Sequence, residues 1–161
     1  HGMVDRARRA LDRAVRGEAW DAALEHRYFV ETLLETFDGD RGRAVDRAES
    51  LEKLPLPAGS APLQRRVVAL RAALTALARA FARRSLDGDA EILEAASKNS
   101  PLVHWAMRYG AAVAHLERGN RDRAQLLLAD APRWPIDSAF CAFQEELSGL
   151  AAAPPTSTPS A

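Results

Sequence analysis

The sequence predicts an all-α domain, and three observations support this fold class. Ala, Leu, Arg and Glu, which favour helices, dominate the composition, whereas β-branched and aromatic residues are scarce. No stretch alternates between polar and apolar residues for long enough to indicate a strand. Three glycines that end a helix-like stretch have an alanine five residues later, as Gly17/Ala22, Gly39/Ala44 and Gly119/Ala124. This spacing is typical of a turn into a helix whose first inward-facing residue must be small, so that paired helices pack closely.

The length of 161 residues suits one domain with one core and is too short for two. We expect residues 1–3 to be the remnant of a tag and residues 4–150 to form a single helical domain. Residues 151–161 consist of Ala, Pro, Ser and Thr, so we expect them to form a flexible tail.

Three helices are expected before residue 54. The first covers residues 4–16 and is stopped by a glycine. The second covers about residues 19–37 and carries too many apolar residues for one narrow stripe, which indicates neighbours on two sides. The third follows a glycine break and runs to about Lys53, where the proline-containing loop 54–59 ends it.

A long helix then begins at Ser60, which is a suitable N-cap, with Pro62 in its first turn. Apolar residues recur in it at alternating steps of four and three: Leu63, Val67, Leu70, Leu74, Leu77 and Phe81. This spacing places all six on one face of the helix, so we expect the whole stripe to lie in the core.

In the second half of the chain, residues typical of turns separate several shorter predicted helices. A helix of about ten residues ends near Asn99, and others are expected over residues 102–117, 122–130 and 136–150. The helix over residues 102–117 is rich in small side chains, which permit close approach of a neighbouring helix.

Residues 109–132 carry a small residue in a first helix, a turn glycine, and a small, large, small series in a second helix: Ala112, Gly119, Ala124, Leu128 and Ala131. In this order they resemble a tetratricopeptide repeat. Gly17 and Gly39 look like the same turn, but 22 residues separate them, whereas the family period is about 34. The resemblance implies a degenerate array of three antiparallel helix pairs, stacked side by side, with a C-terminal capping helix.

Proteins of the tetratricopeptide family bind peptides or protein surfaces in a concave groove that the first helix of each pair lines. The resemblance places Ala106, Tyr109, Val113 and Leu116 in this partner-binding groove. None of the four is basic or an amide, so the resemblance implies an apolar ligand segment. The alternative is that these residues pack against the last helix and that no groove is open.

The charge balance argues against a dedicated nucleic-acid binder, because 22 basic residues are matched by 22 acidic residues. Six arginines lie along the long helix and at its end: Arg65, Arg66, Arg71, Arg79, Arg83 and Arg84. A repeat array can use such a row against RNA, but acidic residues offset it here. We therefore expect these arginines to lie on a helix face that is exposed to solvent.

A partial calcium-loop pattern begins at Asp38, with Asp40 and Glu49 at the third and twelfth positions. Gly42, at the fifth position, offers no side-chain ligand, and Arg43 stands where the sharp turn requires glycine. We therefore expect a helix-capping turn instead of a calcium site.

No other motif indicates a metal, a cofactor or catalysis. His104 and His115 are eleven residues apart, which is about 16 Å along one helix and too far for a shared ion. Cys141 has no histidine near it in the sequence, so a buried small hydrophobic role is expected. No string typical of hydrolases, metalloproteases or nucleotide-binding loops occurs. The sequence therefore predicts a protein without enzymatic activity.

These observations favour a protein–protein interaction module, acting as a scaffold or as a regulatory domain. A single cysteine and the absence of an 18-residue apolar run predict a cytoplasmic protein without a membrane segment. Two alternatives stay open: an RNA-binding helical repeat, and a regulatory bundle that binds a small molecule in an apolar pocket near Trp105 and Tyr109.

Overall fold

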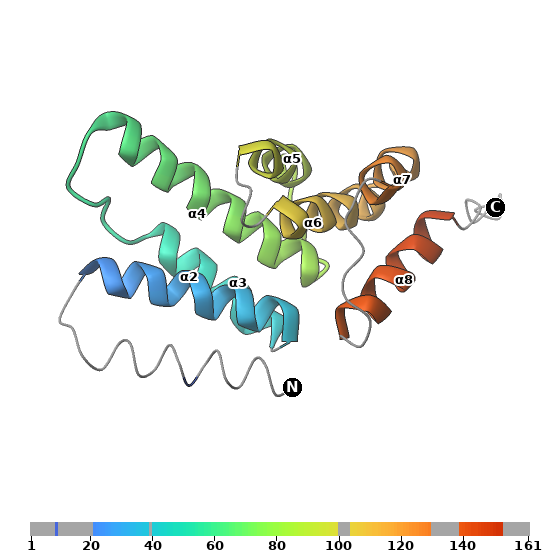
Figure 1. Ribbon diagram of the computed structural model, residues 1–161, viewed down its shortest axis with the longest axis horizontal. Coiled ribbons are helices and arrows are strands. Elements are labelled where there is room, and N and C mark those ends of the chain that lie inside the picture. The colour runs from blue at the N-terminus through green and yellow to red at the C-terminus, as the bar shows by residue number, and fades with distance from the viewer. Residues whose placement is uncertain (1–8, 10–20, 39, 100–103, 130–138, 153–161) are drawn as a thin grey trace, which may run out of the picture.

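The computed structural model describes residues 9, 21–38, 40–99, 104–129 and 139–152. Seven helices are identified within these ranges (Figure 1): α2 (Asp21–Asp38), α3 (Arg41–Glu52), α4 (Ala61–Phe81), α5 (Asp89–Asn99), α6 (His104–Glu117), α7 (Arg121–Ala129) and α8 (Ala139–Ala152). The described residues contain no strand, so the prediction of an all-α domain is confirmed. The expected tag remnant and most of the expected first helix lie outside the described residues.

Successive helices pack side by side in one stack. Each helix from α2 to α7 contacts the helix that follows it. Alternate helices also meet, because α2 contacts α4, α4 contacts α6, and α6 contacts α8 (Figure 1). The last helix extends further than the sequence predicted, since Ala151 is helical and buried instead of opening the tail.

The main core surrounds α6, which is buried on most sides. Large side chains from α4, α5 and α8 meet it there: Leu77, Phe81, Leu93 and Leu147. A Cβ added to Gly110 of α6 would lie 2.6 Å from Leu77 Cδ1, so the absence of a side chain allows α4 and α6 to approach closely. This confirms the prediction that small residues permit close packing of this helix. A smaller cluster of alanines and a valine joins α3 to α4.

The turns behave as the glycine and alanine pairs predict wherever the structure describes them. Gly119 has a φ of 74°, a left-handed conformation that favours glycine, and Ala124 after it is fully buried. Ala44 is likewise fully buried in α3, whereas Gly17, Gly39 and the side chain of Ala22 lie outside the described part. Asp40 caps α3, since its Oδ1 accepts hydrogen bonds from the backbone N–H groups of Gly42 and Arg43 at 2.9 and 3.2 Å.

The first half of α4 differs from its prediction as a core stripe. Leu74, Leu77 and Phe81 are buried, but Leu63 and Leu70 are 45% and 41% exposed. The helix has 21 residues, whereas its neighbours α3 and α5 have 12 and 11, so they cannot cover it over its full length. The prediction is confirmed for the second half of the helix and is wrong for the first half.

Candidate binding groove

The four residues expected to line a partner groove are part of the core. Ala106, Tyr109 and Val113 are fully buried, and Leu116 is half-buried and packs against the same cluster. Leu147 of α8 belongs to that cluster, so the last helix helps to cover this region. Their burial agrees with the alternative in which the four residues pack inside the stack and line no open groove.

A different groove lies beside α4. It has a volume of about 920 Å³ and runs between the first half of α4 and one face of α5, with Met107 of α6 also lining it. The lining residues are Pro62, Arg65, Arg66, Ala69, Leu70, Ala72, Ala73, Ile92, Ala95, Ala96 and Met107. This volume falls within the range of clefts that bind ligands.

Between the two helices, the groove is lined mainly by small apolar side chains. Five of its residues are alanines, three from α4 and two from α5, so the groove is open because the side chains are short. Leu70 and Ile92 are the large apolar side chains at its two sides, and they are 41% and 37% exposed. Exposed apolar surface around a concave site is typical of a surface that binds another molecule.

The polar side chains in the lining are two arginines. Arg65 and Arg66 are exposed, and neither is paired with a carboxylate among the residues that the structure describes. Among the residues that the structure describes, no acidic residue lines the groove. The groove therefore combines an apolar interior with positive charge at one side.

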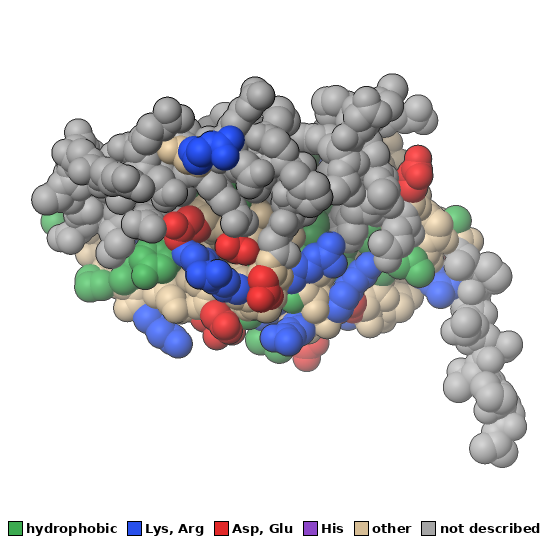
Figure 2. All heavy atoms as spheres, turned by 90° about the horizontal axis from the view of Figure 1, so that it is seen from below, with side chains coloured by type: hydrophobic (Ala, Val, Ile, Leu, Met, Phe, Trp, Pro, Cys, Tyr) green, Lys and Arg blue, Asp and Glu red, His purple; other side chains and the backbone are tan. Residues whose placement is uncertain are grey.

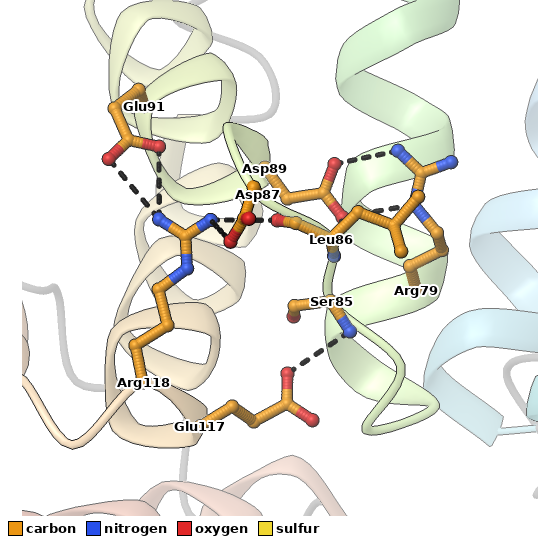
Figure 3. Close-up of polar contacts among 8 residues, drawn as sticks. All are labelled: Arg79, Ser85, Leu86, Asp87, Asp89, Glu91, Glu117 and Arg118. Atoms are coloured by element: carbon orange, nitrogen blue, oxygen red, sulfur yellow. Dashed lines mark hydrogen bonds and ion pairs between the residues drawn. The ribbon is translucent and has the colours of Figure 1, made fainter.

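The position of α5, and with it one side of the groove, is fixed by polar contacts around the α4–α5 turn (Figure 3). Arg79 Nη2 of α4 lies 2.6 Å from Asp89 Oδ1, and Asp89 Oδ2 also accepts a hydrogen bond from the backbone N–H of Leu86 at 2.8 Å. The hydrogen bond to Asp89 raises the pKa of Arg79. These contacts hold the first residue of α5 against the end of α4.

Arg118, the residue that follows α6, contacts the same turn from the other side (Figure 3). Its Nη2 donates to the carbonyl of Leu86 at 2.9 Å and lies 3.2 Å from Asp87 Oδ1, while its Nη1 lies 3.3 Å from Glu91 (Figure 3). Arg118 therefore links α6 to both the turn and the first residues of α5.

A second polar cluster joins α5 to α6 and α7. Glu94 accepts hydrogen bonds from His115 Nε2 at 2.8 Å and from Arg123 Nε at 2.9 Å. The hydrogen bond from Arg123 lowers the pKa of Glu94 to about 2, against the opposing effect of burial and with a smaller contribution from His115. The same bond raises the pKa of Arg123. Glu94 thus remains ionised and holds three helices together, on a face of α5 away from the groove lining.

Two of the six arginines considered for RNA contact are engaged inside the protein. Arg71 is 4% exposed and donates to the carbonyls of Leu54 and Pro55, and Arg79 is bound to Asp89. On the face seen in Figure 2, the described basic and acidic side chains are interspersed and do not form a continuous basic surface. On that face, the arrangement does not favour binding to a polyanion.

The described residues offer neither a metal site nor a membrane-spanning helix. They contain no group of three or more His, Cys, Asp or Glu residues that could hold a metal ion. Within them, no helix has the length and apolar content needed to cross a membrane. The side chain of Cys141 is not among those that the structure describes, so its expected burial stays a prediction.

Comparisons with protein-family models, with curated proteins and with solved structures find no match to this chain. The functional assignment therefore depends on the groove and on the arrangement of the helices.

Proposed function

We propose that this chain is a non-enzymatic interaction module that binds an apolar segment of a protein partner in the groove between α4 and α5. The observation that carries the proposal is the exposure of Leu70 and Ile92 on opposite sides of a groove whose other apolar residues are mostly alanines. Burying these side chains under a partner would remove apolar surface from water, which is the main driving force of association.

The stacking of the helices supports a scaffold role. Each described helix meets its neighbour in the chain, and α2, α4, α6 and α8 also meet in succession. This pattern is compatible with a tetratricopeptide-like array, in which one set of helices packs along the whole stack. In this proposal the array holds the groove rigid and the chain acts in the cytoplasm, which its single cysteine suits.

The test is site-specific photo-crosslinking. A photoreactive phenylalanine analogue replaces Ala69 in the groove, or replaces Leu126, an exposed apolar residue on α7, as a control. After irradiation in a lysate of the source organism, captured proteins are identified by mass spectrometry and the purified partner is tested for binding to the wild-type chain and to Ala69→Trp.

The proposal predicts one protein that is captured from position 69 and not from position 126, and whose binding is lost when Ala69→Trp fills the groove. Crosslinks to RNA would favour the alternative of an RNA-binding array. Equal capture at both positions, or binding that Ala69→Trp does not change, would contradict the proposed use of the groove.

A further inference from the structure

We infer that the segment bound in this groove is an acidic amphipathic helix, with apolar side chains on one face and carboxylates along the edge that meets Arg65 and Arg66. This inference rests on the proposed function, because it names the chemistry of the partner that the same groove would bind. Three features of the groove carry it: its charge, its alanine-rich interior and its setting among helices.

The charge of the groove calls for a negatively charged partner. Three arginines that join elements elsewhere are neutralised within the protein: Arg79 by Asp89, Arg123 by Glu94, and Arg47 by Glu31. In contrast, Arg65 and Arg66 line the groove without a carboxylate partner among the described residues. A basic segment would bring like charges together, whereas an acidic segment would place its carboxylates beside two guanidinium groups.

The interior of the groove favours a helix over an extended strand. The described residues contain no sheet, and the groove is walled by two helices whose own backbone groups are hydrogen-bonded. A strand lying there would bury its N–H and C=O groups against alanine and leucine side chains without an edge to pair with. A helix satisfies these groups internally, so it can enter an apolar groove without that cost.

The short side chains set what the partner's apolar face must contain. Ala69, Ala72 and Ala73 on α4 stand beside Ala95 and Ala96 on α5. Two helices pack well when large side chains of one fill the spaces that small side chains of the other leave. The partner helix is therefore expected to present leucine-sized residues three and four positions apart, with its acidic residues to one side of that stripe.

The experiment is a selection from a displayed peptide library of about 18 residues, a length at which an isolated helix begins to form. Leucine is fixed on one face at helical spacing, and the flanking positions are randomised among Glu, Gln, Lys and Ala. The library is selected in parallel against the wild-type chain, Ala69→Trp, the groove variant Arg65→Glu/Arg66→Glu, and the control variant Arg43→Glu/Arg84→Glu. The control changes the net charge by the same amount at two exposed arginines outside the groove lining.

The inference predicts that wild-type protein and the control variant enrich peptides with glutamate along one flank. The Arg65→Glu/Arg66→Glu variant should enrich lysine at the same positions, and Ala69→Trp should enrich nothing. For the best acidic peptide, replacing its flanking glutamates by glutamine should weaken binding by about three- to tenfold, because exposed ion pairs contribute modestly. This difference should shrink at about 500 mM salt.

Enrichment of neutral or basic peptides that Ala69→Trp abolishes would overturn the acidic helix and leave the groove function standing. Enrichment that Ala69→Trp does not change would contradict the proposed function itself. A dimer of the wild-type chain that Ala69→Trp separates, seen by analytical ultracentrifugation, would show that a second copy fills the groove and would overturn the inference.

Discussion

Arg71 Nη1 donates a hydrogen bond to the carbonyl oxygen of Leu54 at 2.7 Å, at the point where α4 emerges from the core. Its Nη2 donates to the carbonyl of Pro55 at 3.1 Å, so one buried guanidinium binds the start of the α3–α4 connection. The buried residues of α4 lie between Arg71 and Phe81, whereas the groove residues of α4 lie at positions 62–73. This contact therefore marks the change from a core helix to a helix with an open face.

Replacing Arg71 by methionine should lower the free energy of unfolding by about 1–2 kcal/mol, because the two carbonyls lose their donor. The loop that follows α3 should also be cleaved faster by protease. Chemical denaturation measures the first effect and limited proteolysis the second. Arg66→Met is the matched control on the same helix: Arg66 is exposed, so its change should stay within about 0.5 kcal/mol. Equal effects of the two variants would contradict this role.

Gly110 is needed for the close approach of α4, α5 and α6. An added Cβ would lie 2.6 Å from Leu77 Cδ1 and 3.3 Å from Leu93 Cδ1, and both leucines are fully buried. We expect Gly110→Val to destabilise the protein by about 2–3 kcal/mol through overpacking. Gly149 of α8 has nothing within 4 Å of its Cβ position, so Gly149→Ala should stabilise the helix by about 0.5–1 kcal/mol. Thermal or urea unfolding of both variants measures the change in the free energy of unfolding, which should be negative for Gly110→Val and positive for Gly149→Ala.

Gly119 tests the turn that joins α6 to α7. Its positive φ disfavours any residue with a Cβ, although nothing lies within 4 Å of the Cβ position. Gly119→Ala should therefore cost about 1–2 kcal/mol through backbone strain alone. Gly119→Asn should cost less, since asparagine tolerates the left-handed conformation better. Urea denaturation should rank the stabilities as Gly, Asn, Ala, and an alanine variant as stable as wild type would contradict the strained turn.

Glu94 should make the stability depend on pH in the acid range. Its pKa is lowered from 4.5 in the unfolded chain to about 2 in the folded protein, so its contribution is fully present above pH 4.5 and is lost as the pH falls toward 2. At pH 6, Glu94→Gln should lower the free energy of unfolding by about 1–2 kcal/mol. The glutamine carries no negative charge, so its hydrogen bonds with Arg123 and His115 are weaker than those of the carboxylate. Urea denaturation of both proteins from pH 6 to pH 2.5 should show this difference shrinking. A difference that stays constant with pH would contradict the assignment.

The helical fold and its turns could be predicted from local patterns. The Gly119/Ala124 spacing reports two local requirements, a left-handed turn and a small inward residue, and both are met by residues close in the sequence. The cap at Asp40 was predictable for the same reason, because the side chain bonds to backbone groups two and three residues later.

The groove could not be predicted, because it depends on how far neighbouring helices extend along α4. The spacing of Leu63, Leu70 and Leu77 shows that they share a helix face, but only the structure shows that α3 and α5 leave the first two exposed. Conversely, Tyr109 was expected in a groove from the tetratricopeptide resemblance, and the packing of helices around α6 buries it completely. Both differences arise from tertiary contacts that the local sequence does not encode.

The most direct test of the interaction groove is an NMR titration of the ¹⁵N-labelled wild-type chain with the acidic peptide most enriched in the selection. We predict that the amide shift changes concentrate on groove residues such as Arg66, Leu70 and Ile92, and leave the exposed face of α7 around Leu126 unchanged. Shift changes that concentrate on α7 and α8 while the groove residues stay in place would contradict the account.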